Sequence, residues 1–121
     1  MGGGMTQADD TIFMKIVRGE IPAQILYESE NVLAFRDINP VAPSHILVIP
    51  KRAITNLAAA ESSDKELLGE LMLAAAEVAR QEGLADGGYR VVTNIGTNGG
   101  QTVPHLHLHI VGGRPFHWPP G

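Results

Sequence analysis

The hydrophobic positions in the first half of the chain predict one short helix and three strands. Apolar residues recur at helical spacing just ahead of the stop signals Gly19 and Pro22, and these residues are Ile12, Phe13, Ile16 and Val17. Two β-rich runs, 25–28 and 32–36, flank the turn-prone "SEN" and predict a hairpin. The Xaa-Pro pairs in "NPVAP" then force an extended loop, after which "HILVIP" has the length of a strand and ends at a proline.

The second half predicts one long helix and two further strands. Ser63 is a candidate N-cap, Glu66 completes a capping box with it, and Gly83 ends the run, so we expect a helix over 63–82. Its buried stripe should consist of Leu67, Leu68, Leu71, Met72, Ala75, Val78 and Ala79. The runs "YRVVTN" and "HLHLHIV" predict strands on either side of the glycine-rich "IGTNGGQTVP".

This order of elements is typical of an α+β domain with one short and one long helix around an antiparallel sheet of about five strands. With 121 residues, 44% of them hydrophobic, the chain is long enough for one such domain and too short for a second. Residues 1–10 are polar and glycine-rich, and we expect them to be disordered. The domain should therefore span 11–121, with a tail, 112–121, that forms no regular structure.

Composition and charge narrow the possible functions. The net charge is −4, and no run of Lys or Arg exceeds the pair Lys51-Arg52, which argues against broad electrostatic binding of nucleic acid. The chain has no cysteine, so disulfides, thiolate metal sites and a cysteine nucleophile are excluded. No apolar run reaches the roughly 18 residues of a membrane span. We therefore expect a cytoplasmic protein with no membrane contact.

Three histidines recur at every second position in "HLHLHIV". Because alternate side chains of a strand point to one face, His105, His107 and His109 should share a face. Leu106, Leu108 and Ile110 should then face the other way and pack on the long helix, which fixes the register. Pairing with "YRVVTN" would bring Asn94 near the same end.

The histidines allow a solvent-exposed polar face, a metal site or a catalytic site. Three successive alternate positions span too far for all three to reach one ion at about 2.0 to 2.1 Å, and the motif contains no carboxylate. A neutral imidazole can instead serve as a nucleophile or base. In the preceding "GTNGGQT", Gly96, Gly99 and Gly100 would let backbone N–H groups approach an anion, with side-chain donors from Gln101 and Thr102. Phosphate chemistry without a metal is the interpretation these residues favour.

The run "HLHLHIV" also fits the signature of the histidine-triad (HIT) family of nucleotide hydrolases and transferases. Further segments resemble its Hint branch, the purine nucleoside phosphoramidases: "IFMKIVRGEIPA", "LAFRDINPVAPSHILVIPK", "GYRVVTNIGTNGGQTVPHLHLHIVGGR" and "HWPPG". The resemblance implies a HIT-like α+β fold, a homodimer whose sheets join into one, and a nucleoside 5′-monophosphate site on each subunit.

The resemblance also implies the reaction, which is hydrolysis of the P–N bond in adenosine 5′-phosphoramidates of the AMP-NH2 or AMP-lysine type, releasing AMP and an amine without a metal or cofactor. His107 would attack phosphorus and form a nucleotidyl-histidine intermediate. His105 would orient His107, and His109 would hold phosphate oxygens. His45 would join the proton network, and Thr102 would lie near the leaving amine.

The remaining implied contacts concern the nucleotide. Asp37 would bind the ribose, and the base pocket would be formed by Phe13, Ile16, Phe35, Ile38 and Leu47. The phosphate would lie near Asn94, Gly100, Gln101, Thr102, Val103, His107 and His109, and Trp118 would reach over from the partner subunit. Two positions depart from the commonest pattern of the branch: Thr102 stands where Ser is frequent, and Pro104 stands where a larger residue is usual.

Three alternatives remain open from sequence. The protein could cleave dinucleoside polyphosphates, as a sister activity of the superfamily, although the "WPPG" tail argues against this. It could be chiefly a nucleotide-binding or scaffolding module, or a small histidine-rich metal binder. The identity of the amine and the choice between adenine and guanine stay undetermined.

Overall fold

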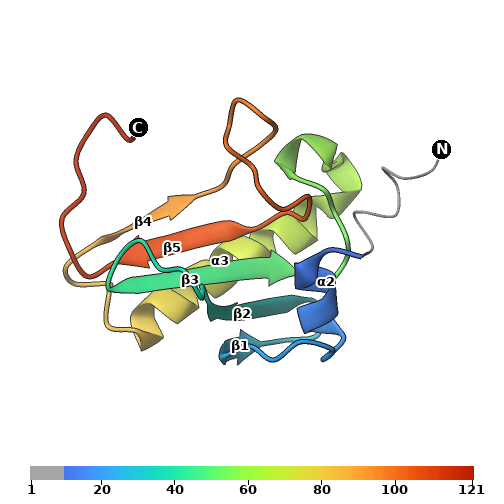
Figure 1. Cartoon of the computed structure of the whole chain (residues 1–121), viewed down its shortest axis with the longest axis horizontal. Coiled ribbons are helices and arrows are strands. Elements are labelled where there is room, and N and C mark those ends of the chain that lie inside the picture. The colour runs from blue at the N-terminus through green and yellow to red at the C-terminus, as the bar shows by residue number, and fades with distance from the viewer. Residues whose placement is uncertain (1–9) are drawn as a thin grey trace.

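A five-stranded antiparallel sheet forms the centre of the protein, with a long helix on one face and a short helix on the other (Figure 1). This computed structural model describes residues 10–121, so the expectation for 1–10 lies almost wholly outside the described residues. The strands are β1 (Ile25–Glu28), β2 (Val32–Arg36), β3 (Ser44–Pro50), β4 (Tyr89–Val92) and β5 (Leu108–Gly112), arranged in the order β1-β2-β3-β5-β4.

The helices are α2 (Ile12–Val17) and α3 (Lys65–Gln81), and two short 3-10 helices, η1 (Leu57–Ala59) and η2 (Ser62–Asp64), precede α3. The predicted α+β fold is thus confirmed, with both helices and all five strands in the expected order. Within the described residues, neither helix combines the length and the hydrophobicity that crossing a membrane would require.

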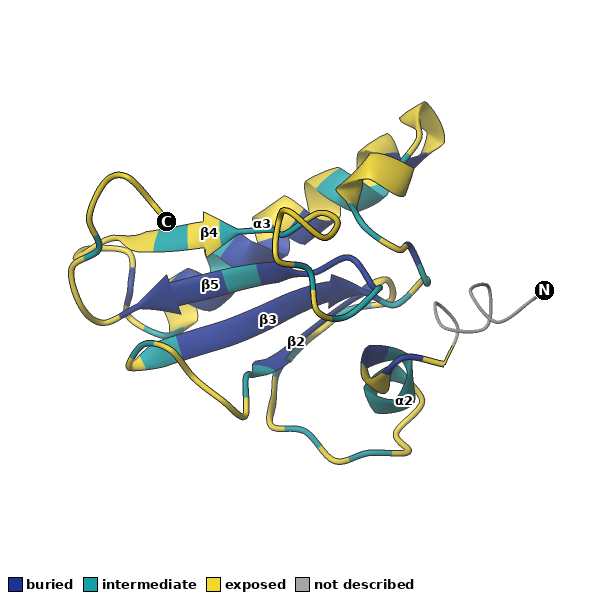
Figure 2. Ribbon diagram, turned by 45° about the horizontal axis from the view of Figure 1, so that its top comes forward, coloured by how far each residue is buried: buried dark blue, intermediate teal, exposed yellow. Residues whose placement is uncertain are grey.

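Strands β2 and β3 are buried on both faces because each alternates between two hydrophobic clusters. Val32, Ala34, Ile46 and Val48 pack with α3 in the larger cluster. Leu33, Phe35, Leu47 and Ile49 pack with Phe13 of α2 in the smaller one. Figure 2 shows β3 and β5 as the buried centre of the sheet. The smaller cluster lies on the α2 side. Because α2 is short and covers only part of that face of the sheet, the rest of the face is open for a site.

The start of α3 corrects the sequence analysis. The α-helix begins at Lys65, and Ser63 lies inside η2 instead of capping the helix. The carboxylate of Asp64 accepts a hydrogen bond from the backbone N–H of Glu61 at 2.8 Å, so the reciprocal cap lies two residues before the predicted one. The prediction that Met72 belongs to the buried stripe is wrong. Met72 is 55% exposed, and Ala74 is buried in the stripe instead. Positions 71, 74, 75, 78 and 79 share one face of a 3.6-residue helix, and position 72 lies just beyond the edge of that face.

The histidine strand is shorter than predicted. Regular pairing of β5 begins at Leu108, because the backbone N–H of His105 donates to Val103 and that of Leu106 donates to Ile54. β4 likewise ends at Val92 and not at residue 94. The alternation of faces nevertheless holds: Leu106, Leu108 and Ile110 all pack in the α3 cluster, as predicted.

Candidate active site

A cavity of about 440 Å³ opens on the side of the sheet opposite α3. Its walls come from α2, the loop between β2 and β3, and the segment that enters β5. Of the residues predicted for a site, the following line it: Phe13, Ile16, Phe35, Asp37, Ile38, His45, Leu47, Thr102, Val103, His107 and His109. Residues that are distant in sequence therefore meet in one place, with apolar and polar groups together, as in a ligand site.

The apolar wall is built across three elements. Strand register places Phe35 beside Leu47, and Leu47 beside His109 on the next strand. The ring of Phe13 contacts Phe35 edge-on at 5.6 Å between centroids, and contacts His107 in the same way at 5.0 Å. α2 thus buries the histidine ring while it closes the apolar side of the cavity. Ile38 stands at the rim with 84% of its surface exposed.

His107 is held in a single tautomer by the backbone. Its Nδ1 lies 2.6 Å from the carbonyl oxygen of His105. A carbonyl oxygen can only accept, so Nδ1 carries the proton and donates it, and Nε2 keeps a free lone pair. Burial lowers the pKa of His107, with partial compensation from this hydrogen bond. The ring is therefore neutral near pH 7, with a nucleophilic nitrogen available.

His105 does not line the cavity. Its side chain is fully buried, and its Nε2 donates to the carbonyl oxygen of Pro50 at 2.8 Å. Burial lowers its pKa, and its Nδ1 has no hydrogen-bond partner among the described residues. The predicted orienting role of His105 thus has a physical basis in its main-chain carbonyl, while its side chain anchors the segment to the end of β3.

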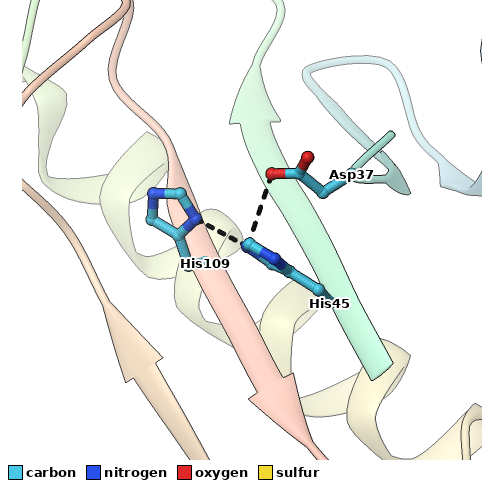
Figure 3. A group of neighbouring side chains, drawn as sticks. All are labelled: Asp37, His45 and His109. Carbon is cyan, nitrogen blue, oxygen red and sulfur yellow. Dashed lines mark hydrogen bonds and ion pairs between the residues drawn. The ribbon is translucent and has the colours of Figure 1, made fainter. Parts of the chain in front are cut away.

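His45 connects His109 to Asp37, as Figure 3 shows. The backbone N–H of Val41 donates to Nδ1 of His45 at 3.1 Å, which places the His45 proton on Nε2. That nitrogen lies 2.9 Å from Nδ1 of His109 and 3.4 Å from Oδ2 of Asp37. His109 consequently accepts at Nδ1 and carries its own proton on Nε2.

The environment keeps His109 neutral as well. Burial, followed by the neighbouring imidazoles of His107 and His45, lowers its pKa to about 4. The rings of His107 and His109 lie 4.9 Å apart between centroids. The pair therefore offers one nitrogen lone pair and one N–H donor side by side.

Asp37, His45 and His109 also bring their ligand atoms within 4.8 Å of one another, which is close enough for a shared metal ion. Ligation through Nε2 of His45 would move its proton to Nδ1, where it would face the N–H of Val41. The contacts of His45 with His109 and Asp37 already explain why these ligand atoms lie close together. These residues fit a resident metal only if the Val41 contact is given up.

The glycine-rich loop, residues 94–103, differs from the predicted phosphate cradle. The N–H groups of Gly100 and Gln101 donate to the carbonyls of Thr97 and Gly96, both at 3.1 Å. The N–H of Gly96 donates to the Gln101 side chain at 2.9 Å. These hydrogen bonds stabilise the turn and occupy the N–H groups of Gly96 and Gly100, two of the three glycines predicted to approach an anion. The loop instead presents Thr102 and Val103 to the cavity.

Four residues predicted to touch nucleotide do not line the cavity of this chain: Asn94, Gly100, Gln101 and Trp118. The side chain of Asn94 donates to the Gly99 carbonyl at 2.7 Å, and the side-chain donors of Gln101 bind two other carbonyls. Trp118 is 84% exposed, on a tail that lies at the far end of the sheet from α2 (Figure 1).

Comparison with known proteins identifies the family of this chain. A family model of the HIT domain matches residues 18–116. The chain belongs to the HIT domain family. A HIT-like protein of Synechocystis is 58% identical over 94% of this chain and 99% of its own length. A maize protein called "14 kDa zinc-binding protein" is 58% identical over 92% of this chain and 88% of its own length.

Solved structures of HIT proteins share the fold. A HIT family hydrolase from Legionella pneumophila superimposes with a TM-score of 0.90 and 48% identity, covering 93% of this chain and 100% of that protein. This similarity shows that the protein is like the HIT family hydrolases. Its three-histidine motif lies within the residues that match the HIT domain.

Sequence reasoning missed Val41 and Thr93. Val41 acts through its backbone N–H on His45, and the hydroxyl of Thr93 donates to the His107 carbonyl at 2.8 Å. The proline-flanked position of Val41 between Asp37 and His45 was a usable signal, because such a loop has little freedom. Thr93 gave no signal beyond its place at a strand end.

Proposed function

We propose that the protein is a purine nucleoside phosphoramidase of the Hint branch, which hydrolyses the P–N bond of adenosine 5′-phosphoramidates. The observation that carries this proposal is the hydrogen bond from His107 Nδ1 to the His105 carbonyl, because it leaves Nε2 unprotonated in a cavity lined by His107 and His109. A nucleophilic nitrogen and an N–H donor in adjacent positions suit attack on phosphorus without a metal.

In the first step, Nε2 of His107 forms a bond to the α-phosphorus while the P–N bond to the amine breaks. The leaving nitrogen takes up one proton, which reaches it from solvent by way of His109 Nε2 and the Thr102 hydroxyl. In the second step, water adds to phosphorus, the nitrogen–phosphorus bond to His107 breaks, and one proton returns to solvent. AMP and the amine are released, and the net co-reactant is one water molecule.

The rest of the cavity supports a nucleoside. The Asp37 carboxylate lines it and can accept hydrogen bonds from ribose hydroxyls. Phe13, Phe35 and Leu47 offer an apolar surface for a base. A dinucleoside polyphosphate would use the same nucleophile, so the two substrate classes are distinguished by their relative turnover.

The decisive experiment combines turnover with intact-mass analysis. The protein is mixed with a fluorogenic adenosine phosphoramidate, the reaction is quenched without acid, and the intact mass of the protein is measured. A transient adduct of one AMP should form in the wild type and be absent in His107→Ala, while Gln81→Ala, on the exposed side of α3, should match the wild type. Full activity in His107→Ala would disprove the nucleophile assignment. Faster turnover of diadenosine polyphosphates than of phosphoramidates would favour the sister activity.

The proposed active form is a homodimer. β4 is an edge strand of the sheet, and its exposed side chains include Tyr89 at 36% and Val91 at 38%. An apolar edge with unpaired backbone groups favours pairing with a second copy. Such a dimer would join the two sheets and allow Trp118 to reach the partner's site. Sedimentation equilibrium should give twice the chain mass, and a monomer with full activity would contradict this.

Zinc binding is a second candidate, favoured by the cluster of Asp37, His45 and His109 and by the name of the maize relative. Because ligation would cost the Val41 hydrogen bond, Zn²⁺ should bind weakly and compete with AMP. Chelation should leave phosphoramidase activity unchanged, and loss of activity that Zn²⁺ restores would instead make the metal part of the reaction.

A further inference from the structure

The segment that leads into β5 has irregular backbone although it carries three cavity residues, Thr102, Val103 and His107. It is held by residues 50–56, at the end of β3 and just beyond. The N–H of Leu106 donates to the Ile54 carbonyl at 2.6 Å, and the His105 ring donates to the Pro50 carbonyl at 2.8 Å. The third attachment is the side chain of Gln101.

The side-chain amide of Gln101 makes four hydrogen bonds to protein. Its Nε2 donates to the carbonyls of Thr55 at 2.8 Å and Val103 at 2.9 Å. Its Oε1 accepts from Asn56 Nδ2 at 3.0 Å and from the Gly96 N–H at 2.9 Å. Two donors and two acceptor positions are all that a primary amide has. Gln101 therefore ties both ends of the glycine-rich loop to residues 55 and 56.

Asn56 fixes the orientation of that amide. Its Oδ1 accepts the N–H of Ala59 at 3.2 Å, as the cap of η1. Its Nδ2 must then be the atom that faces Gln101, which makes the Gln101 atom opposite it an oxygen. The remaining contacts agree with this assignment, because Nε2 of Gln101 faces two carbonyl oxygens.

We propose that Gln101, oriented by Asn56, is a positioning residue that places Thr102 and Val103 at the reactive end of the cavity. Gln101 itself does not line the cavity, so it acts through its two neighbours and not by contact with a ligand. The identity of the ligand rests on the proposed function, whereas the positioning of the loop does not.

The chemistry requires an amide at position 101. In Gln101→Glu, a carboxylate oxygen would face the carbonyls of Thr55 and Val103, and both donors would be lost. In Gln101→Met, a side chain of similar length would make none of the four bonds. Asn56→Asp would keep the cap to Ala59 and turn an oxygen toward Oε1. All three changes should release the loop while the sheet and both hydrophobic clusters stay intact.

The kinetic test uses these variants with Gln81→Glu, on the exposed side of α3, as the matched control. We expect kcat on the adenosine phosphoramidate to fall about ten- to hundredfold in Gln101→Glu and Gln101→Met, since a displacement of about 1 Å can cost a hundredfold in rate. AMP should bind more weakly, while adenosine, which has no phosphate, should bind as in the wild type. A variant that weakens adenosine and AMP equally would show general damage and overturn the proposal.

A double-mutant cycle tests the pair. If Asn56 acts through Gln101, Asn56→Asp combined with Gln101→Met should be no slower than Gln101→Met alone. Additive losses would show that Asn56 acts independently and would overturn the role assigned to it.

A readout that needs no substrate separates this proposal from the proposed function. Amide hydrogen exchange at Gly96 should accelerate at least about tenfold in Gln101→Met, because its N–H loses Oε1, while amides of α3 keep their protection. Unchanged exchange at Gly96 would overturn the positioning role. If the wild type neither binds AMP nor cleaves phosphoramidates, the proposed function fails, and the exchange result still decides this proposal.

Discussion

The ring of His107 donates a hydrogen bond of 2.6 Å to the carbonyl oxygen of His105, two residues earlier in the chain. The acceptor belongs to the backbone, so the tautomer of His107 depends on main-chain geometry and not on the identity of the side chain at position 105. The side chain of His105 instead anchors the segment at Pro50. The first and second histidines of the motif therefore have separable functions.

Replacement of His105 by leucine should affect stability more than catalysis. The carbonyl that orients His107 remains, but the Pro50 carbonyl loses its donor, which costs about 1 to 3 kcal/mol of unfolding free energy. Urea unfolding and steady-state kinetics on His105→Leu and His107→Leu measure the two effects. We expect a loss in kcat below about tenfold for the first variant and near-complete loss for the second. Equal loss of activity in both would refute the separation.

The proton on His109 should depend on His45. In His45→Ala, Nδ1 of His109 loses the donor that holds its tautomer, and we expect kcat to fall about a hundredfold. His45→Gln can still present an N–H and should recover part of this loss. The comparison of kcat between the two variants is the measurement, and an equal defect in both would argue that His45 acts by its ring chemistry instead.

Stability should fall as the pH drops below neutrality. The pKa of His109 is lowered to about 4 in the folded protein, whereas an unfolded histidine titrates near about 6.5. Above the unfolded value both states are neutral, and as the pH falls toward 4 the unfolded state binds protons first and is favoured. The midpoint of urea unfolding should therefore decrease between about pH 6.5 and 4.

The pH effect has a direct control in the His109→Asn variant. It lacks this titrating group and should lose less stability over the same interval, whereas His117→Ala, in the tail, should behave as the wild type. The same pH slope in wild type and His109→Asn would show that His109 does not contribute.

Gly99 should not tolerate a side chain. A Cβ there would lie 2.3 Å from the Ile95 carbonyl oxygen, so the glycine-rich loop would have to shift. Gly99→Ala should weaken AMP binding by more than about tenfold through displacement of Thr102 and Val103. Gly87→Ala is the matched control, because a Cβ at Gly87 meets nothing within 4 Å. Calorimetric titration with AMP measures both, and wild-type affinity in Gly99→Ala would contradict the expectation.

The pattern of the sequence was sufficient for most of the fold. The bounds of α2, β1 and β2 follow from local periodicity and turn residues, and β1 and β2 pair as the predicted hairpin. The predicted start of α3 was wrong because the sequence holds two overlapping capping signals, Glu61 with Asp64 and Ser63 with Glu66. The Glu61–Asp64 contact is formed instead of the one at Ser63. Periodicity also could not tell that Met72 lies outside the buried stripe, since position 72 borders the buried face.

The candidate site, like the fold, was determined partly by the sequence and partly by the tertiary structure. The sequence determined by itself that the motif's leucines face α3 and that its histidines alternate with them, because a two-residue period is a local property of the chain. Only the tertiary structure decided which atom each histidine uses. His45 reaches His109 across 64 residues, and Gln101 reaches Thr55 across 46. Such contacts depend on the register of neighbouring strands and on where the ladder stops, and neither is encoded in the spacing of any one segment.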